Sequence, residues 1–217
     1  MSHTSRIAII GGTGKLGHAI AGRLAAAGVS VTIGSRSKES AQEAAAQLPG
    51  EVSGMDNAAA AAAADEIVIL AVPFAAHETT LAEIGPGLAG KILVDTTVPL
   101  APPKVMRVQM PPAGCAAIET RAAVAEDVIV VSAFHNVAAH RLAEHGPIAC
   151  DVLVFGDDKD ARQKVVDLAR LMGLKGLHAG ALVNSVAAEA LTSILIFINK
   201  TYGADGAGLQ ITGLPEA

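Results

Sequence analysis

The chain has 217 residues, of which 51% are hydrophobic and only 2% aromatic, and its formal net charge is −5. This length fits one large domain with a core of Ala, Val, Leu and Ile, and a negative charge without any Lys/Arg cluster argues against nucleic-acid binding. Cys115 and Cys150 have the spacing of neither metal ligands nor a disulfide framework, so we expect no metal and two free thiols in a cytoplasmic protein.

Short apolar runs alternate with helical patterns along the chain. The apolar runs that favour strands cover residues 7–10, 29–34, 67–72, 91–95, 128–131 and 152–155, with a short possible strand at 176–178. The helical patterns cover residues 16–27, 40–48, 57–64, 77–84, 158–172 and 183–202, and the Pro-rich stretch 98–112 is expected to be a surface excursion. The alternation predicts an α/β fold: a Rossmann-type, doubly wound, mostly parallel sheet with a small C-terminal helical part.

The first strand runs into a glycine-rich turn. Three glycines with the G-x-G-x-x-G spacing follow the apolar residues 7–10 and precede a helical pattern. In dinucleotide-binding units, such glycines allow a tight turn, a close approach of the pyrophosphate, and close packing of the helix on the strand. The N-terminus of the helix then offers free N–H groups to the phosphates. The predicted nucleotide-binding loop comprises Gly12, Thr13, Gly14, Lys15, Leu16 and Gly17.

The end of the second predicted strand distinguishes NADP from NAD. NAD-binding units usually place Asp or Glu there, to hydrogen-bond the ribose 2′-hydroxyl, whereas a 2′-phosphate calls for Arg and small donors. This chain has Ser35, Arg36 and Lys38 at that point and no acidic residue before Glu39. Because a guanidinium binds phosphate through two charge-assisted hydrogen bonds, the pattern predicts NADP. A solvated basic turn is the alternative.

The loops that follow the parallel strands are expected to line the site. Right-handed crossovers bring the carboxyl ends of the strands to one edge of the sheet, where the ligand crevice of such folds lies. The loops in question are residues 11–16, 34–38, 72–74, 96–102 and 132–137.

The sequence lacks the acid–base groups of common ketone reductases. The β-hydroxyacid dehydrogenases place a Lys four residues after an Asn on a helix that follows the Rossmann unit, and the comparable stretch here has Ala188 four residues after Asn184. No Tyr-x-x-x-Lys exists either, since the only Tyr is Tyr202. Direct hydride transfer between two stacked rings needs positioning more than an acid, so the pattern favours transfer between NADP and a flavin-like ring.

Several motifs together resemble the deazaflavin-dependent NADP reductases, which exchange hydride between NADP(H) and coenzyme F(420), an 8-hydroxy-5-deazaflavin. The resemblance rests on the glycine-rich turn and on Gly34-Ser35-Arg36, Val72-Pro73-Phe74, Val98-Pro99, Val131-Ser132-Ala133-Phe134-His135, Gly156-Asp157-Asp158 and Ala179-Gly180-x-Leu182-x-Asn184-Ser185. It extends over nearly the whole chain. The Ser-Ala-x-His and Ala-Gly-x-Leu-x-Asn-Ser pieces are more specific than the glycine-rich ones.

The resemblance implies a small homodimer that holds two rings face to face in the crevice. It places Thr13, Ser35 and Arg36 at the 2′-phosphate, assisted by Lys38. His135 would hydrogen-bond a deazaflavin oxygen as hydride arrives, and it is therefore the predicted catalytic residue. The residues expected to flank the dinucleotide or border the rings are Val72, Pro73, Phe74, Val98, Pro99, Ala133 and Asn136.

Other interpretations of these residues stay open. His135 could instead cap the next helix, Phe74 could belong to the core, and Ser185 with Asn184 could cap the last helix. Phe74 and Asn136 also stand where the family has Trp and Thr. A flavin or a small imine is therefore an alternative second substrate, and a sensor that binds NADPH without turnover is an alternative function.

The predicted division is an NADP-binding Rossmann domain at 1–180 and a C-terminal helical segment at 181–217 that completes the site. Apolar residues on more than one face of the helix at 183–202 indicate contact with a partner, most simply in a homodimer. Glu189, Asn199 and Lys200 interrupt this apolar stretch, so no membrane span is expected. The expected partners are thus small molecules and a second copy of the chain.

Overall fold

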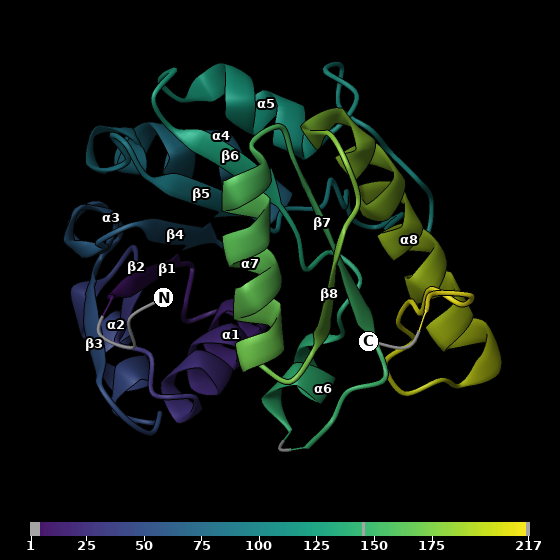
Figure 1. The fold of residues 1–217 in the computed structure, drawn as a ribbon, viewed down its shortest axis with the longest axis horizontal. Coiled ribbons are helices and arrows are strands. Elements are labelled where there is room, and N and C mark those ends of the chain that lie inside the picture. Colours follow the sequence, from purple (N-terminus) through teal and green to yellow (C-terminus); the bar gives the residue numbers. More distant parts are fainter. Residues whose placement is uncertain (1–4, 145, 216–217) are drawn as a thin grey trace.

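The computed structural model describes residues 5–144 and 146–215. At its centre is an eight-stranded sheet in the order β3-β2-β1-β4-β5-β6-β7-β8 (Figure 1). The strands are β1 (Ile7–Ile10), β2 (Val31–Ser35), β3 (Val52–Asp56), β4 (Ile67–Leu70), β5 (Ile92–Asp95), β6 (Ile129–Ser132), β7 (Asp151–Gly156) and β8 (Lys175–His178). Strands β1 to β6 are parallel, whereas β7 runs antiparallel to β6 and parallel to β8. This topology confirms the predicted doubly wound, mostly parallel sheet.

Helices cover both faces of this sheet (Figure 1). They are α1 (Lys15–Ala26), α2 (Lys38–Ala45), α3 (Asn57–Ala63), α4 (Phe74–Ile84), α5 (Ala116–Ala123), α6 (Ala139–Ala143), α7 (Lys159–Leu171) and α8 (Ser185–Tyr202), with 3-10 turns at Gly85–Gly87 and Leu182–Asn184. Buried residues of α1, α2 and α7 share one hydrophobic cluster, and those of α3 and α4 share another. Helix α6 packs on α1, and α8 packs on α5.

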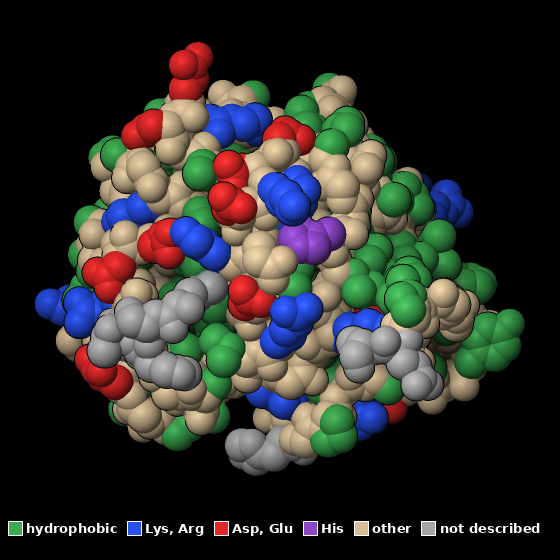
Figure 2. Space-filling view, viewed as in Figure 1, with side chains coloured by type: hydrophobic (Ala, Val, Ile, Leu, Met, Phe, Trp, Pro, Cys, Tyr) green, Lys and Arg blue, Asp and Glu red, His purple; other side chains and the backbone are tan. Residues whose placement is uncertain are grey.

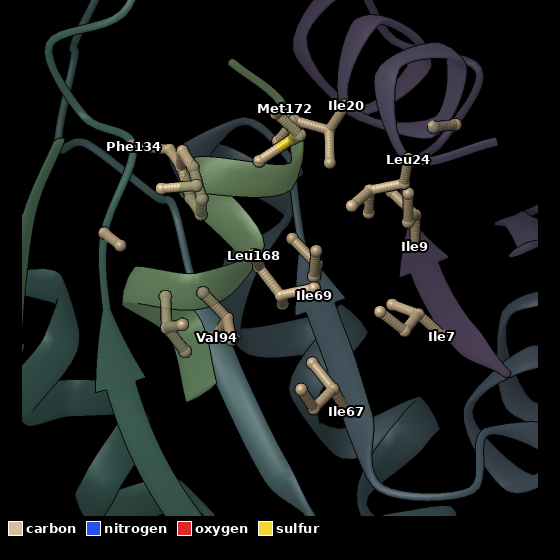
Figure 3. Packing of buried hydrophobic residues seen from close by; sticks show 14 of the residues in the cluster. Ile7, Ile9, Ile20, Leu24, Ile67, Ile69, Val94, Phe134, Leu168 and Met172 are labelled. Carbon is tan, nitrogen blue, oxygen red and sulfur yellow. The ribbon is translucent and has the colours of Figure 1, made fainter. Parts of the chain in front are cut away.

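The two clusters follow from the two-residue period of the strands. Ile7 and Ile9 of β1 point to the same face as Ile69 of β4, toward Leu24 of α1 and Leu168 of α7 (Figure 3). The residues between them along each strand point to the opposite face and join the second cluster. Because both faces of the parallel sheet are covered, its strands read as continuous apolar runs, and this is why the sequence located them.

Several predicted boundaries were wrong by two or three residues, each for a local reason. Strand β2 begins at Val31 and not at residue 29, because the N–H of Val29 donates to the carbonyl of Leu24 and completes the end of α1. Strand β4 ends at Leu70 and not at residue 72, and α4 begins at Phe74 and not at residue 77, because Pro73 forms the N-cap of that helix.

Three elements were not predicted at all. Strand β3 is a partly exposed edge strand that contains Gly54, and such strands carry a weak apolar signal. Helices α5 and α6 have only 8 and 5 residues. The stretch 98–112 is an irregular, largely exposed excursion, as predicted.

Helix α8 buries an unexpected set of side chains. Within this chain it buries Ser185, Glu189 and Ser193 together with Ala188 and Leu195. Its exposed side chains include the large hydrophobic ones Val186, Ile194, Phe197 and Tyr202, and Figure 2 shows hydrophobic side chains gathered over α8 and the C-terminal segment. Part of the apolar surface that the sequence analysis attributed to partner contact therefore lies exposed on this chain.

By length and mean hydropathy alone, the stretch Leu182–Tyr202 would be long and apolar enough to cross a membrane. The expectation that no run reaches this length was therefore too strict. Polar side chains of the same stretch are hydrogen-bonded inside the fold, as described below, which is typical of a helix that belongs to a globular core.

Candidate functional site

The glycine-rich loop after β1 brings backbone N–H groups to the start of α1. The positive φ that makes its tight turn belongs to Gly11 (φ 79°), one residue before the first glycine of the predicted motif. A Cβ on Gly17 would lie 2.6 Å from the carbonyl oxygen of Gly11, so only glycine lets α1 pack this closely on the loop. The first turn of α1 contains no acidic residue. This helix terminus is therefore suited to bind phosphate, and its contact with a bound nucleotide stays a prediction.

The predicted 2′-phosphate residues lie beside this loop. The hydroxyl oxygens of Thr13, in the loop after β1, and of Ser35, the last residue of β2, are 3.5 Å apart. Arg36 follows at the surface. Ser37 forms the N-cap of α2, where its Oγ accepts a hydrogen bond from the N–H of Ser40. Two hydroxyls and a second helix terminus thus lie at the carboxyl end of β2, where Arg36 follows in the sequence.

The loop after β4 places an aromatic ring at the same edge of the sheet. Pro73 forms the N-cap of α4, and the half-buried ring of Phe74 stacks on the imidazole of His77, with ring centroids 6.0 Å apart. Val72 is half-buried and packs on the second hydrophobic cluster. Phe74 therefore lies at the carboxyl edge of the sheet and contacts a residue of a buried polar network. The prediction of Phe74 as a dinucleotide contact did not include this network.

That network centres on Asp95 at the carboxyl end of β5. Its carboxylate accepts hydrogen bonds from His77 Nε2 (3.1 Å), Thr120 Oγ1 (2.5 Å) and the backbone N–H of Thr97 (2.9 Å). Burial alone would raise the pKa of Asp95, but these hydrogen bonds and the imidazole hold the pKa below its usual value. Burial likewise opposes the charge of His77, yet Asp95 raises the pKa of His77 overall. The two groups form a buried ion pair when His77 is protonated, which is the form that Asp95 favours.

One polar atom next to this network lacks a partner. The hydroxyl of Thr97 is buried and has no hydrogen-bond partner within residues 5–144 and 146–215. Buried hydroxyls are nearly always satisfied, so this one is a candidate contact for a bound ligand. Thr97 directly precedes Val98, which is half-buried, and Pro99, which is buried.

The loop after β6 is strained and buried. Phe134 has a φ of 67°, the only positive φ among the non-glycine residues that the structure describes, and its side chain is buried. Such strain persists only where the surrounding packing imposes it. The turn brings Nε2 of His135 to 2.8 Å from Oγ of Ser132, and Ala133 between them is fully buried.

His135 and Asn136 are linked to α8. The side-chain amide of Asn136 donates to the carbonyl of Ala188 and to Oγ1 of Thr192, and Thr192 in turn donates to the carbonyl of His135. Burial lowers the pKa of His135 to about 4, against a smaller opposite effect of Asp95, so the imidazole is neutral at pH 7. The interaction of either residue with a bound ring stays a prediction.

Glu189 is the acidic group that the sequence analysis missed. Its carboxylate is 1% exposed and accepts hydrogen bonds from the N–H groups of Ala116 (2.7 Å) and Ala117 (3.2 Å) at the N-terminus of α5. Burial raises the pKa of Glu189 to about 7, while hydrogen bonds from Ala116, Ser185 and Ala117 oppose the shift and the charge of Asp95 adds to it. An acid within an otherwise apolar helix was the one sequence signal for such a group.

The hollows of the molecule extend this picture. A groove of about 520 Å³ between α1, α2 and α6 begins at Thr13, Gly14 and Lys15. A more enclosed hollow of about 410 Å³ lies at the amino ends of β1 and β4, lined by Ile7, Ile67 and residues of α7. The second hollow is at the opposite edge of the sheet from every loop described above, so it does not contribute to this site.

Comparisons with known proteins agree with this geometry. A family model described as NADP oxidoreductase, coenzyme F420-dependent, matches residues 6–99. The F420-dependent NADP reductase of Methanocaldococcus jannaschii is 38% identical over an alignment that covers 96% of this chain and 99% of that protein. The enzyme of the same name from Methanothermobacter thermautotrophicus is 35% identical, with 97% and 96% covered. A crystal structure from Arthrobacter sp. FB24, provisionally described as an F420-dependent NADP reductase, superposes with a TM-score of 0.82 at 28% identity, covering 96% of this chain and 99% of that one.

Proposed function

The chain belongs to the coenzyme F420-dependent NADP oxidoreductase family, and we propose that it transfers hydride directly between NADP(H) and a deazaflavin coenzyme. In one direction, NADPH, oxidised deazaflavin and one proton give NADP⁺ and reduced deazaflavin. The observation that carries the deazaflavin assignment is the similarity to F420-dependent NADP reductases over nearly the full length of the chain. Relatives that shared the nucleotide-binding half alone would support NADP but not its partner.

The residues present fit NADP. The start of α1 offers N–H groups to the pyrophosphate, while the hydroxyls of Thr13 and Ser35 and the guanidinium of Arg36 would hold the 2′-phosphate. Lys38, exposed at the start of α2, adds positive charge there. The buried hydroxyl of Thr97, which has no partner in the described part of the chain, would serve a polar group of one of the two rings.

The second ring would lie between the loops after β4, β5 and β6. Phe74 is half-buried and offers apolar surface, while Pro99, Ala133, His135 and Asn136 are buried in the loops that would border the ring. A bound deazaflavin supplies a ring carbon that accepts hydride, and the protein holds the two rings in contact and excludes water. The residues named as ring contacts are part of this proposal.

We also propose that the enzyme acts as a cytoplasmic homodimer with no membrane or nucleic-acid partner. The exposed fractions of Phe197 and Ile194 on α8 are 52% and 46%, and helical spacing puts the exposed Val186 on the same side, with Tyr202 exposed at the end of the helix. Contiguous apolar side chains of this kind mark interaction surfaces in soluble proteins. A second copy of α8 would cover them by twofold symmetry.

Rapid mixing of the protein with NADPH and each candidate acceptor tests the reaction. We expect loss of the deazaflavin absorbance band within one turnover, and much slower bleaching of FMN or FAD. Faster bleaching of a flavin would favour the alternative flavin reductase, and tight NADPH binding without bleaching of any acceptor would favour a sensor. In either case the deazaflavin assignment fails.

The variant Arg36→Ala tests the nucleotide assignment separately. Hydrogen bonds to charged groups contribute about 1.5–3 kcal/mol each, so NADPH should bind about 10- to 100-fold more weakly to this variant, while NADH binding changes little. Arg170→Ala removes an exposed guanidinium from α7 and is the matched control. Equal losses for NADPH and NADH would show that Arg36 does not hold the 2′-phosphate.

A further inference from the structure

Four buried polar side chains form a continuous hydrogen-bonded chain between α8 and the loop after β6. Nε2 of His135 lies 2.8 Å from Oγ of Ser132, which lies 2.7 Å from Oγ of Ser185. Oγ of Ser185 lies 2.9 Å from Oε1 of Glu189. All four residues are at most 7% exposed. The chain thus joins a carboxyl group to an imidazole across two hydroxyls.

The direction of every hydrogen bond follows from the charge of Glu189. An ionised carboxylate only accepts, so Ser185 donates to Oε1. Each hydroxyl has one proton, so Ser132 must donate to Ser185, and Nε2–H of His135 must donate to Ser132. The neutral imidazole then has a bare lone pair on Nδ1. Nδ1 has no hydrogen-bond partner among the described residues. It is also not one of their fully buried polar atoms without a partner, so it is accessible from the surface.

Protonation of Glu189 reverses the whole chain. Oε2 accepts the shorter backbone hydrogen bond, from Ala116 (2.7 Å), and Oε1 the longer one, from Ala117 (3.2 Å), so the added proton resides on Oε1 and is donated to Ser185. Ser185 then donates to Ser132, and Ser132 donates to the lone pair on Nε2. Nδ1 now has the proton of the imidazole. The two ionisation states of one buried acid thus correspond to the two tautomers of His135.

We propose that Ser132, Ser185 and Glu189 form a proton relay whose outlet is Nδ1 of His135, with Glu189 as the store for the proton that the deazaflavin exchanges during hydride transfer. In one direction, Nδ1 takes a proton from the ring, Nε2 passes its own to Ser132, Ser132 to Ser185, and Ser185 to Oε1. In the other direction each step reverses. The relay rests on the proposed function, in which hydride addition to the oxidised ring leaves an anion that takes up one proton.

Burial of the four hydrogen-bonded side chains explains why a proton relay is favoured over a positively charged histidine. Burial lowers the pKa of His135 to about 4, so an imidazolium is disfavoured at pH 7, whereas the pKa of Glu189 is about 7. The relay passes a proton through His135 without a buried imidazolium as its resting state. The ionisable groups that face the chain are Asp95 and His77, which form an ion pair, and Cys115 and Glu119 near the start of α5.

A purely structural role for Glu189 is the competing explanation, because its carboxylate also caps α5. A cap would not control the tautomer of a histidine on another element. The discriminating measurement is therefore the tautomer itself, read from the ¹⁵N chemical shifts of the His135 ring in ligand-free protein, with His135→Gln to assign the signals.

We expect the wild-type spectrum to change from the Nε2–H to the Nδ1–H tautomer as the pH falls from 8.5 to 5.5, with a midpoint near 7. Glu189→Gln presents an N–H group to Ser185 and should fix the Nδ1–H tautomer at every pH. Ser185→Ala interrupts the chain and should abolish the transition. Ser193→Ala removes another buried hydroxyl of α8, whose contact is the carbonyl of Arg107, and should titrate like the wild type.

The relay would be disproved by a His135 tautomer that does not change with pH, or by a transition like that of the wild type in Ser185→Ala.

Single-turnover reduction of the deazaflavin tests the function of the relay. Ser185→Ala should lower the rate of this reduction about 100-fold, as expected for loss of a positioned proton donor. It should also remove the inflection near pH 7 from the pH profile of the rate, and NADPH binding should not change. Ser132→Ala should do the same. If no deazaflavin is reduced even by the wild type, the proposed function fails while the tautomer measurement still decides on the relay.

Discussion

Replacement of Glu189 by Gln should change how the stability of the protein depends on pH. In the folded protein burial raises the pKa of this carboxyl from 4.5 to about 7, so the folded state binds its proton more tightly than the unfolded state does. The resulting stabilisation is complete below pH 4.5 and is lost as the pH rises to about 7. A shift of this size corresponds to about 3 kcal/mol of unfolding free energy. Gln is neutral throughout and lacks this dependence.

Urea unfolding at several pH values, at one fixed protein concentration, measures the effect. The wild-type free energy of unfolding minus that of Glu189→Gln should fall by about 3 kcal/mol between pH 4.5 and 8, with most of the fall before pH 7. Glu78→Gln, which neutralises an exposed carboxylate of α4, controls for the loss of one charge. A difference that stays constant over this range would show that Glu189 is not a buried acid of raised pKa.

Two further substitutions test the nucleotide loop and the proposed dimer. Gly17→Ala places a Cβ 2.6 Å from the Gly11 oxygen, so calorimetry should show at least about tenfold weaker binding of NADPH. Gly22→Ala is the control, because its Cβ would meet only the end of the Leu48 side chain at 3.3 Å, and it should bind NADPH normally. Phe197→Asp should shift the protein from dimer to monomer in sedimentation equilibrium without loss of NADPH binding, and equal sedimentation of variant and wild type would remove α8 from the interface.

The sheet could be predicted from the sequence because its buried strands are continuous apolar runs bounded by Gly and Pro. The glycine-rich turn and the Ser-Arg pair after β2 could be predicted because their chemistry is local: the residues that would bind one phosphate lie within a few positions of each other. The structure brings Thr13 to Ser35, as that interpretation requires. Strand β3 was missed because an exposed edge strand lacks the continuous apolar run from which the other strands were predicted.

The buried polar network could not be predicted, because its partners are distant in the sequence. Glu189 meets the N–H groups of Ala116 and Ala117 across more than 70 residues, and Asp95 meets His77 from a neighbouring element. The sequence showed Glu189 only as an interruption of an apolar helix. The absence of a Lys or Tyr at the expected positions was correctly seen, but it did not mean that the site lacked ionisable groups.

The contacts of Glu189 tie α8 to the rest of the fold, which supports the proposal that the C-terminal helical segment completes the site. The first half of α8 satisfies polar groups of the nucleotide-binding part: the amide of Asn136, the hydroxyl of Ser132 and the N-terminus of α5. Each such group would cost about 1–3 kcal/mol if it stayed buried without a partner, a large share of the stability of a typical domain. The second half of α8 exposes the apolar face proposed for the dimer. In the proposed dimer, contact on that face would act on the same helix that holds Glu189, and α8 would then connect the dimer interface with the proposed relay.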